Sequence, residues 1–591
     1  MCCLSLYSSR GSHLPIGRRL GKNIFSETAA KVAKYNLKLE QLMQELRDRA
    51  LLDAHYSSQQ IFEDLSLDCL VCAGQIGLNT AKKCLDGTRT GILNEVIDWI
   101  NNTDPVAPRI FWLHGQAGKG KSAIAHTVAL QAQNLGVLGS CFCFTRVRQH
   151  EGLHTKLFPT IARDLADRDL RLRPVLAQVI SNNHSLRDTA DIAMQWQKFI
   201  VEPLSRLESP STANVVVIID ALDESGAETT REPILEALAA HGAKLPTTIR
   251  ILLTSRPLVD IREMLNATGH IHAKSLDDID AKLTIADIRL YASYRLKRFG
   301  TTFSDENLQH LAMKSDGGFE WVHLACDFVS HRFKVIAQQC LDDILSHTPG
   351  DGRTLLDELY VTFLKEFTRG SSDVLCMFHS VMQQILWLKK PLPIGALDFM
   401  RTRFPQEEDC YPVGDILNLI ASLLSGINEA STPVCPLHTS FYDFLLDEKR
   451  GGEFYIPQGD VHRDLAVASL SVMKAGLRFN ICGLETSYLA NSEVLDLDKR
   501  VEENIPPYLL YACQFWATHL QDVAFDVELA QLMGQFVTGK HVLFWLEALG
   551  VSKLIGNAYW ALRSAEKWFQ VRSFIVSCYH VNDQLTGTDG V

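Results

Sequence analysis

The chain has 591 residues, of which 46% are hydrophobic and 21% are charged, and its formal net charge is −11. This length and composition predict a globular protein of about three to five domains. The acidic balance leaves no overall basic surface for nucleic acid, and no run of about 18 strongly apolar residues predicts a membrane span. We therefore expect protein partners, and neither nucleic acid nor a membrane.

The first 84 residues predict a tail followed by a helical region. Residues 1–23 are basic and contain no acidic residue, which predicts a disordered tail despite a superficial similarity to a transit peptide. Residues 24–84 carry leucines at helical spacing among charged residues, as in Leu39, Leu42 and Leu46. This pattern predicts a short helical region.

The 15 cysteines are odd in number and scattered, often inside apolar patterns. Cys69-x-x-Cys72 is the only close CxxC pair in the sequence, and no second pair follows at zinc spacing. This usage indicates reduced, packed thiols and a cytoplasmic protein.

A complete G-x-x-x-x-G-K-S pattern, the Walker A motif, lies at residues 115–122 between an apolar run and a helical pattern. Its glycines let the backbone N–H groups face phosphate oxygens, Lys121 reaches the β- and γ-phosphates, and the Ser122 hydroxyl binds Mg²⁺. The helix that follows adds positive potential at its N-terminus. We therefore assign the whole segment to nucleotide binding: Gly115, Gln116, Ala117, Gly118, Lys119, Gly120, Lys121, Ser122 and Ala123.

Acidic residues follow a second strand pattern, the β-branched run at residues 215–219. Asp220 comes directly after it and is the expected Mg²⁺ partner, as in a Walker B motif, while Asp223 or Glu224 can orient or deprotonate the attacking water. A third strand pattern ends at Thr254-Ser255-Arg256, which makes Arg256 a candidate contact for the γ-phosphate. The catalytic candidates are thus Asp223, Glu224 and Arg256.

The alternation of strand and helix patterns over residues 85–275 predicts an α/β P-loop NTPase core with a doubly wound, mostly parallel sheet. Strand-like runs lie near residues 110, 140, 217, 251 and 271. Residues 276–365 predict a helical domain, and residues 456–591 predict an α-helical C-terminal region with aromatic and aliphatic stripes.

Four segments, GTRTGILNEVIDWI, FWLHGQAGKGKSAIAHTVA, VVVIIDALDES and ILLTSRP, occur in this order. They resemble the NACHT domain of STAND P-loop NTPases, in particular the fungal NLR-like family of the NACHT-WD40 type. The resemblance covers roughly residues 66–570 and implies a winged-helix domain at 366–455. It favours Asp223 over Glu224 as the residue that positions water.

The resemblance also implies roles for residues outside these strand ends. Thr88 and Arg89 match the family's entry segment near the base and ribose, and Arg146 matches another frequent arginine. His438 matches the winged-helix histidine that contacts the ADP β-phosphate in related proteins. A contact made only in the ADP state would provide the differential affinity that a switch needs.

Members of this family usually continue into a repeat array. The last part of this chain has no 40-residue period and no GH…WD signature, so we expect it to lack the WD40 repeats.

The resemblance implies a nucleotide-dependent signalling switch. It would bind ATP or ADP with Mg²⁺, act as a weak NTPase that hydrolyses ATP slowly, and open and form a homo-oligomer in the ATP state, in fungal innate immunity or non-self recognition. GTP stays open as a ligand, since nothing in the P-loop selects the base. Two alternatives stay open too: an energy-coupled, AAA+-like ATPase, and a nucleotide-binding scaffold or decoy without sensor and effector.

Overall fold

The computed structural model describes residues 15–585 except 75, 188, 208–213, 267, 331–333, 347–352, 407–410 and 428. These residues form two compact units. The first comprises the described residues up to Val71 together with Leu165–Thr189, and the second comprises Cys72–Asp164 and the described residues from Ala190 onward. Across these ranges, no helix combines the length and the apolar character that a membrane crossing requires.

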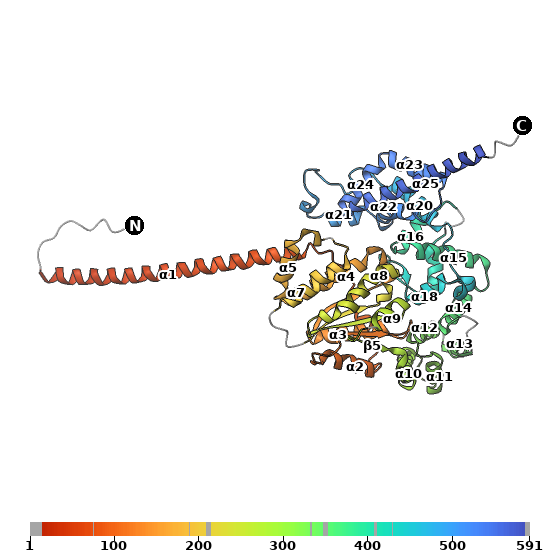
Figure 1. Cartoon of the computed structure of the whole chain (residues 1–591), viewed down its shortest axis with the longest axis horizontal. Coiled ribbons are helices and arrows are strands. Elements are labelled where there is room, and N and C mark those ends of the chain that lie inside the picture. Colours follow the sequence, from red (N-terminus) through yellow and green to blue (C-terminus); the bar gives the residue numbers. More distant parts are fainter. Residues whose placement is uncertain are drawn as a thin grey trace. The chain divides into compact units, whose positions relative to one another are not determined.

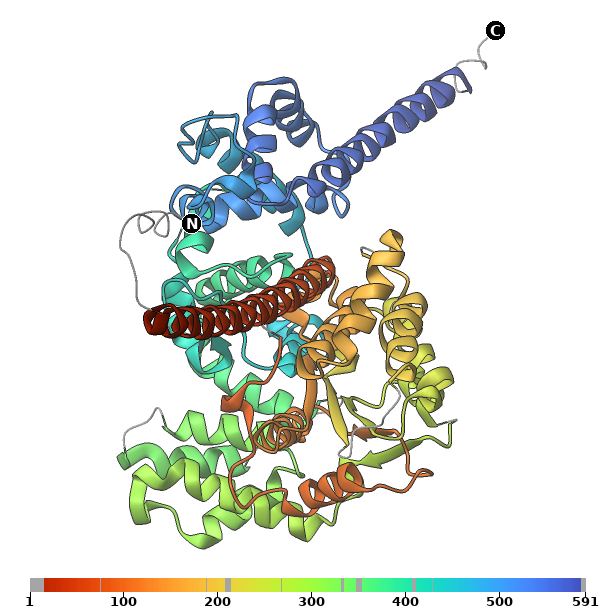
Figure 2. The same ribbon diagram turned by 90° about the vertical axis from the view of Figure 1, so that its left-hand side faces the viewer.

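The first unit is built on one long helix, α1 (Pro15–Leu67), which Figures 1 and 2 show as continuous. It contacts α5 (Leu172–Asn182) of the same unit, where Arg173 pairs with the acidic residues Glu63 and Asp64. The disorder expected for residues 1–23 does not hold for 15–23, because α1 already begins at Pro15. Proline fits a first helical position, and no glycine or proline interrupts the chain from Lys22 to Leu67. Residues 1–14 lie outside the described residues.

The second unit contains a parallel five-stranded sheet of order β2-β3-β4-β1-β5. Each strand coincides with a predicted run, and the inner strand β3 is buried along its whole length, as its β-branched sequence requires. The predicted α/β core with a parallel sheet is thus confirmed. The strands are β1 (Ile110–His114), β2 (Leu138–Cys143), β3 (Val215–Asp220), β4 (Ile249–Ser255) and β5 (Ile271–Ser275).

Alternate residues of the strands point to one face of the sheet, where α2 (Thr90–Asn101) and α3 (Lys121–Asn134) cover them. Phe111, Ile218 and Leu252 belong to this core. Because the strands are parallel, β1, β3 and β4 all end at one edge of the sheet. The P-loop, the acidic segment and Arg256 leave the sheet there, which is where ligands of open α/β sheets bind.

Residues from 281 onward are almost entirely helical and share one hydrophobic core that runs from Ile288 to Trp568. Figure 1 shows α20, α22, α23 and α24 packed together in its later part. Among the described residues, members of this core lie on both sides of the predicted boundaries near residues 365 and 455, which stay predictions. Two short antiparallel strands, β6 (Leu424–Ser425) and β7 (Cys435–Pro436), precede α18 (Thr439–Leu446). The winged-helix assignment for 366–455 stays a prediction.

An aromatic cluster joins two parts of this core. Tyr360 on α14 (Leu355–Thr368) lies 4.9 Å from Phe441 and 5.3 Å from Phe444 of α18, measured between ring centroids. All three rings are almost completely buried. They fix α18 against the helices that precede it.

The other helices of the chain are α4 (Leu153–Arg168), α6 (Ile192–Gln195), α7 (Glu202–Ser205), α8 (Glu228–His241), α9 (Val259–Asn266), α10 (Ala281–Leu296), α11 (Asp305–Lys314), α12 (Phe319–Ser330), α13 (Lys334–Ser346), α15 (Ser372–Trp387), α16 (Ile394–Arg401), α17 (Val413–Leu417), α19 (Glu448–Gly451), α20 (Val461–Gly476), α21 (Leu497–Asn504), α22 (Pro507–Leu520), α23 (Val527–Thr538), α24 (His541–Val551) and α25 (Gly556–Leu585).

Candidate nucleotide-binding site

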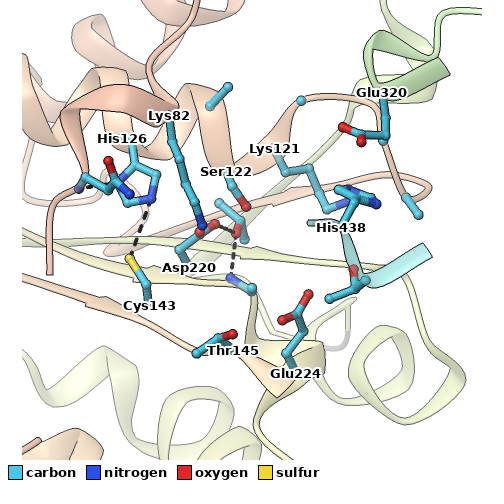
Figure 3. Close-up of a pocket in the computed structure, with 18 of the residues that line it drawn as sticks. Lys82, Lys121, Ser122, His126, Cys143, Thr145, Asp220, Glu224, Glu320 and His438 are labelled. Atoms are coloured by element: carbon cyan, nitrogen blue, oxygen red, sulfur yellow. Dashed lines mark hydrogen bonds between the residues drawn. The ribbon is translucent and has the colours of Figure 1, made fainter. Parts of the chain in front are cut away.

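A cavity of about 670 Å³ lies at the sheet edge where the motifs meet (Figure 3). Its walls come from the P-loop, the ends of β3 and β4, residues 76–89, α10 and α12, and the segment Pro436–Tyr442 before and within α18. This volume suits a small-molecule ligand. The cavity therefore brings together side chains separated by more than 300 positions in the sequence.

The P-loop curls through left-handed backbone at Gly118 and Gly120, whose φ angles are 76° and 94°. A Cβ at Gly118 would also lie 2.8 Å from Glu320 Cβ, so glycine is needed there for space as well. Of the nine assigned residues, six line the cavity: Ala117, Gly118, Gly120, Lys121, Ser122 and Ala123. Gly115, Gln116 and Lys119 do not line it.

Lys121 bends back onto its own loop. Its Nζ donates hydrogen bonds to the carbonyls of Gly115 and Gln116, at 2.8 and 2.9 Å. Burial lowers the pKa of Lys121 to about 8, although Asp223 and Asp220 act in the opposite direction. A phosphate group would stabilise the charged ammonium far better than the two carbonyls do.

We expect nucleotide binding to take up a proton at about pH 9. The ordinary pKa of lysine is 10.5, so between about 8 and that value the free protein holds Lys121 mostly neutral, whereas a bound phosphate restores its charge. At about pH 7 the ammonium is already charged and should take up none. Calorimetry in two buffers of different ionisation enthalpy measures the proton count, and equal counts at both pH values would contradict the assignment.

Asp220 and Ser122 lie beside each other at the floor of the cavity (Figure 3). Asp220 is 3% exposed, and its Oδ1 accepts a hydrogen bond of 2.5 Å from Thr254 Oγ1. Thr254 thereby fixes the rotamer of the carboxylate. A hydroxyl and an ionised carboxylate are ligands that suit Mg²⁺, so these two predicted residues fit a magnesium site.

The two remaining acids after β3 have different surroundings. Asp223 is tied to Arg256: its Oδ1 accepts the Arg256 backbone N–H at 3.0 Å, and its Oδ2 lies 3.1 Å from Arg256 Nε. Among the described residues, the Glu224 carboxylate accepts one hydrogen bond, from the Arg146 backbone N–H at 3.2 Å. Burial first, and Asp223 second, raise the pKa of Glu224 to about 7. A pKa near the working pH suits a general base, which favours Glu224 over the Asp223 that the family resemblance favours.

Arg256 lines the cavity. Arg146 follows β2 and does not line it, although its neighbours Thr145 and Val147 do. Arg256 donates from Nη2 to Thr439 Oγ1 of α18 at 2.9 Å. Both arginines contact α18, Arg256 through Thr439 and Arg146 through Asp443, and the Arg146 backbone also contacts Glu224.

Thr88 and Arg89 also line the cavity. Arg89 has left-handed backbone (φ 59°), donates from Nη2 to Lys119 O at 2.9 Å, and places its guanidinium 4.7 Å above the Phe319 ring. Thr88 donates to Leu85 O at 2.7 Å. Both side chains therefore shape the wall of the cavity, and Arg89 also attaches the P-loop to α12.

His438 closes the cavity from the α18 side (Figure 3). Its Nδ1 accepts the Ser440 backbone N–H at 3.1 Å, so the ring proton must be on Nε2. Ser440 Oγ lies 2.6 Å from the same Nδ1 and 2.8 Å from Tyr360 Oη, which extends the chain of hydrogen bonds to α14. Burial, together with Arg256 and Lys121, lowers the pKa of His438 to about 3. The imidazole is therefore a neutral donor at physiological pH.

Sequence reasoning missed three charged residues of this site: Lys82, Glu320 and Asp443. Lys82 extends toward Ser122 and Asp220, and Glu320 stands beside the P-loop (Figure 3). Burial raises the pKa of Glu320 to about 7. A detectable signal existed for the two acids, because each interrupts an otherwise apolar helical run, GGFEWV and SFYDFLL. Their partners lie far away in the sequence, so the signal alone does not identify a role.

The candidate ligand atoms of His126, Cys141 and Cys143 lie within 4.8 Å of one another, and His126 and Cys143 line the cavity. His126 Nδ1 accepts the Asn79 backbone N–H at 3.2 Å, which leaves the proton on Nε2, 3.9 Å from Cys143 Sγ. A protonated Nε2 faces the sulfur as a donor and is not arranged as a metal ligand. We therefore assign these residues to packing, as the sequence predicts for the cysteines.

Residues 87–256 match the family model described as Nephrocystin 3, N-terminal. A solved structure of a Signal Transduction ATPase with Numerous Domains (STAND) protein with a tetratricopeptide repeat sensor, from Pyrococcus horikoshii, is 13% identical, with a TM-score of 0.34. The match covers 84% of this chain and 66% of that one, so this chain spans less than two thirds of its length. No curated protein matches. Residues 87–256 are thus similar to NACHT-related P-loop NTPases.

Proposed function

We propose that the protein is a nucleotide-dependent switch in which ADP stabilises a closed form and ATP favours an open, self-assembling form. The observation that carries this proposal is the composition of the cavity wall. The P-loop core and the segment Pro436–Tyr442 face the same space. A ligand that fills it contacts both, so its phosphate state biases whether they stay together.

The proposed ligands are ATP and ADP with Mg²⁺, and GTP remains open. Ser122 and Asp220 would hold the ion, which neutralises phosphate charge when bound. Lys121 and the P-loop amides would bind the phosphates, with Thr88 and Arg89 in the wall toward the base and ribose. Glu224 would accept a proton from the attacking water, and Asp223 would position Arg256. Glu224, with a pKa of about 7, would then be the base for the weak NTPase activity that we propose.

His438 would report the diphosphate state. Its Nε2–H is fixed by the hydrogen bonds at Nδ1, and the residue lies near Lys121 in the cavity (Figure 3). A neutral donor on a diphosphate would hold α18 in the closed form. The proposal includes the winged-helix assignment of 366–455, homo-oligomerisation on activation, and the narrower role in fungal innate immunity or non-self recognition.

Light scattering of the full chain tests the switch. We expect a monomer with ADP and a defined homo-oligomer with a non-hydrolysable ATP analogue. His438→Ala should lower ADP affinity about tenfold, as expected for one lost hydrogen bond to a charged group, and should allow assembly with ADP as well. His310→Ala removes an exposed imidazole and should behave as the wild type.

Two outcomes would favour the other functions. Steady turnover above about 1 per second in a preformed ring would indicate an energy-coupled ATPase. Tight nucleotide binding that changes neither shape nor assembly would indicate a scaffold.

A further inference from the structure

Glu320 is an acidic residue of α12 that lines the cavity (Figure 3). Among the described residues, no N–H or O–H group donates to its carboxylate, and no cationic side chain forms an ion pair with it. Burial raises the pKa of Glu320 to about 7, and the nearby Asp327 acts in the same direction. A ligand that supplies hydrogen-bond donors would therefore satisfy an acceptor that the protein itself does not.

The P-loop holds Glu320 close to the backbone that would bind phosphates. The Glu320 backbone N–H donates to Gly118 O at 3.1 Å, and a Cβ at Gly118 would lie 2.8 Å from Glu320 Cβ. Arg89 lies 4.7 Å above the Phe319 ring and donates to Lys119 O, so it fixes the residue before Glu320 as well. The start of α12 is thus attached to the P-loop directly through Gly118 and indirectly through Arg89.

The two lysines of the P-loop have other partners. Lys121 Nζ donates to two carbonyls of the loop itself. Lys119 Nζ donates to Asp316 O and lies 3.9 Å from Asp277 Oδ1. Neither lysine pairs with Glu320 among the described contacts, so the loop that would bind an anion leaves the charge of this neighbouring carboxylate unbalanced.

A nucleotide held by its phosphates brings two kinds of group close to a P-loop: the phosphates and the sugar that carries them. An ionised carboxylate repels phosphate, since both are negative. Ribose is neutral, and its 2′- and 3′-hydroxyls are neighbouring O–H donors that the two oxygens of one carboxylate can accept together. The carboxylate of Glu320 therefore suits the sugar and not the phosphates.

We propose that Glu320 binds the ribose hydroxyls of the nucleotide and makes the cavity select ribonucleotides over deoxyribonucleotides. The proposal rests on the nucleotide binding of the proposed switch and adds to it the residue that recognises the sugar. Because Glu320 belongs to α12, the sugar contact also connects the helical part of the chain directly to the ligand.

Titration calorimetry of the full chain with ADP and with 2′,3′-dideoxy-ADP tests the contact. The wild type should bind ADP about tenfold more tightly, because the dideoxy sugar has no hydroxyl for the carboxylate. In Glu320→Leu the ratio of the two affinities should fall to about one. The ratio is the quantity to compare, since loss of a charge beside the phosphates changes the affinity of both ligands alike.

Glu306→Leu is the matched control. Glu306 is exposed and is the second residue of α11, as Glu320 is the second residue of α12. The two variants therefore lose the same favourable interaction with a helix N-terminus, and Glu306→Leu should keep the tenfold ratio.

A wild type that binds ADP with a ratio near one, or a ratio that Glu320→Leu leaves at about tenfold, would overturn the inference and leave the switch intact. A changed preference between ADP and IDP in Glu320→Leu, with the sugar ratio unaltered, would overturn it too, because the carboxylate would then contact the base. A wild type that binds no nucleotide would contradict both proposals. If Glu320→Leu does not fold, Glu320→Gln keeps the shape of the side chain and should reduce the ratio to about threefold, because a neutral acceptor forms a weaker hydrogen bond.

Discussion

Replacing Lys121 with methionine is expected to lower the affinity for ATP and ADP at least about 100-fold. Lys121 is the cation of the P-loop that reaches the cavity, and methionine keeps its length without its charge. The same variant should raise the melting temperature of the nucleotide-free protein, because a buried ammonium of lowered pKa is removed. Fluorescent-nucleotide binding and thermal melts measure the two effects.

The stability gain has a pH window. At neutral pH the wild type carries the full cost of the buried charge, because its pKa of about 8 lies below the ordinary 10.5. From about 8 to 10.5 the unfolded chain binds more protons than the folded protein, so wild-type stability rises and the gain of Lys121→Met should shrink. Lys390→Met, at an exposed position, should show neither effect. A variant that is destabilised and still binds nucleotide would contradict the placement of Lys121.

Replacing Glu224 with glutamine is expected to reduce ATP hydrolysis about 10²- to 10⁴-fold while ATP binding is retained. The amide keeps the hydrogen bond from the Arg146 backbone but accepts no proton from water. The wild-type rate should rise as the pH passes about 7, where Glu224 becomes ionised. Single-turnover hydrolysis and filter binding measure these quantities.

Asp223→Asn is the matched comparison for Glu224→Gln. Asp223 pairs with Arg256. Loss of the Asp223 charge should therefore weaken the interaction of Arg256 with the γ-phosphate more than it slows the proton transfer from water. The assignment of Glu224 as base fails if Asp223→Asn abolishes hydrolysis with normal ATP affinity and Glu224→Gln does not.

The NTPase core could be predicted from the sequence because its signals are local. Strand β3 consists of five β-branched residues followed by an acidic residue. The P-loop needs glycines because its backbone is left-handed at those positions. Parallel strands then carry Ser122, Asp220 and Arg256 to one edge of the sheet without further information. These residues line one cavity, as expected, whereas their chemical roles remain proposals.

The second half of the site could not be derived in this way. Asp443 and Glu320 look like single charges on apolar helices until α18 and α12 are packed against the core. Which of Asp223 and Glu224 acts as the base likewise depends on the position of Arg256. The residues around the two acids in the sequence do not reveal that position. The basic composition of residues 1–23 predicts a tail, but Pro15 and the residues after it form the first turns of α1, because basic composition does not oppose a helix.

The aromatic cluster of Tyr360, Phe441 and Phe444 gives the proposed opening a thermal property. If α18 leaves α14, three rings that are almost fully buried become hydrated, and hydration of apolar surface raises the heat capacity. The enthalpy of opening would then change with temperature. Contacts of the ligand inside the closed cavity would not add to this heat-capacity change. In an opening that separates α18 from α14, the balance between the diphosphate and triphosphate forms would therefore be coupled to temperature through a packing contact that touches no phosphate.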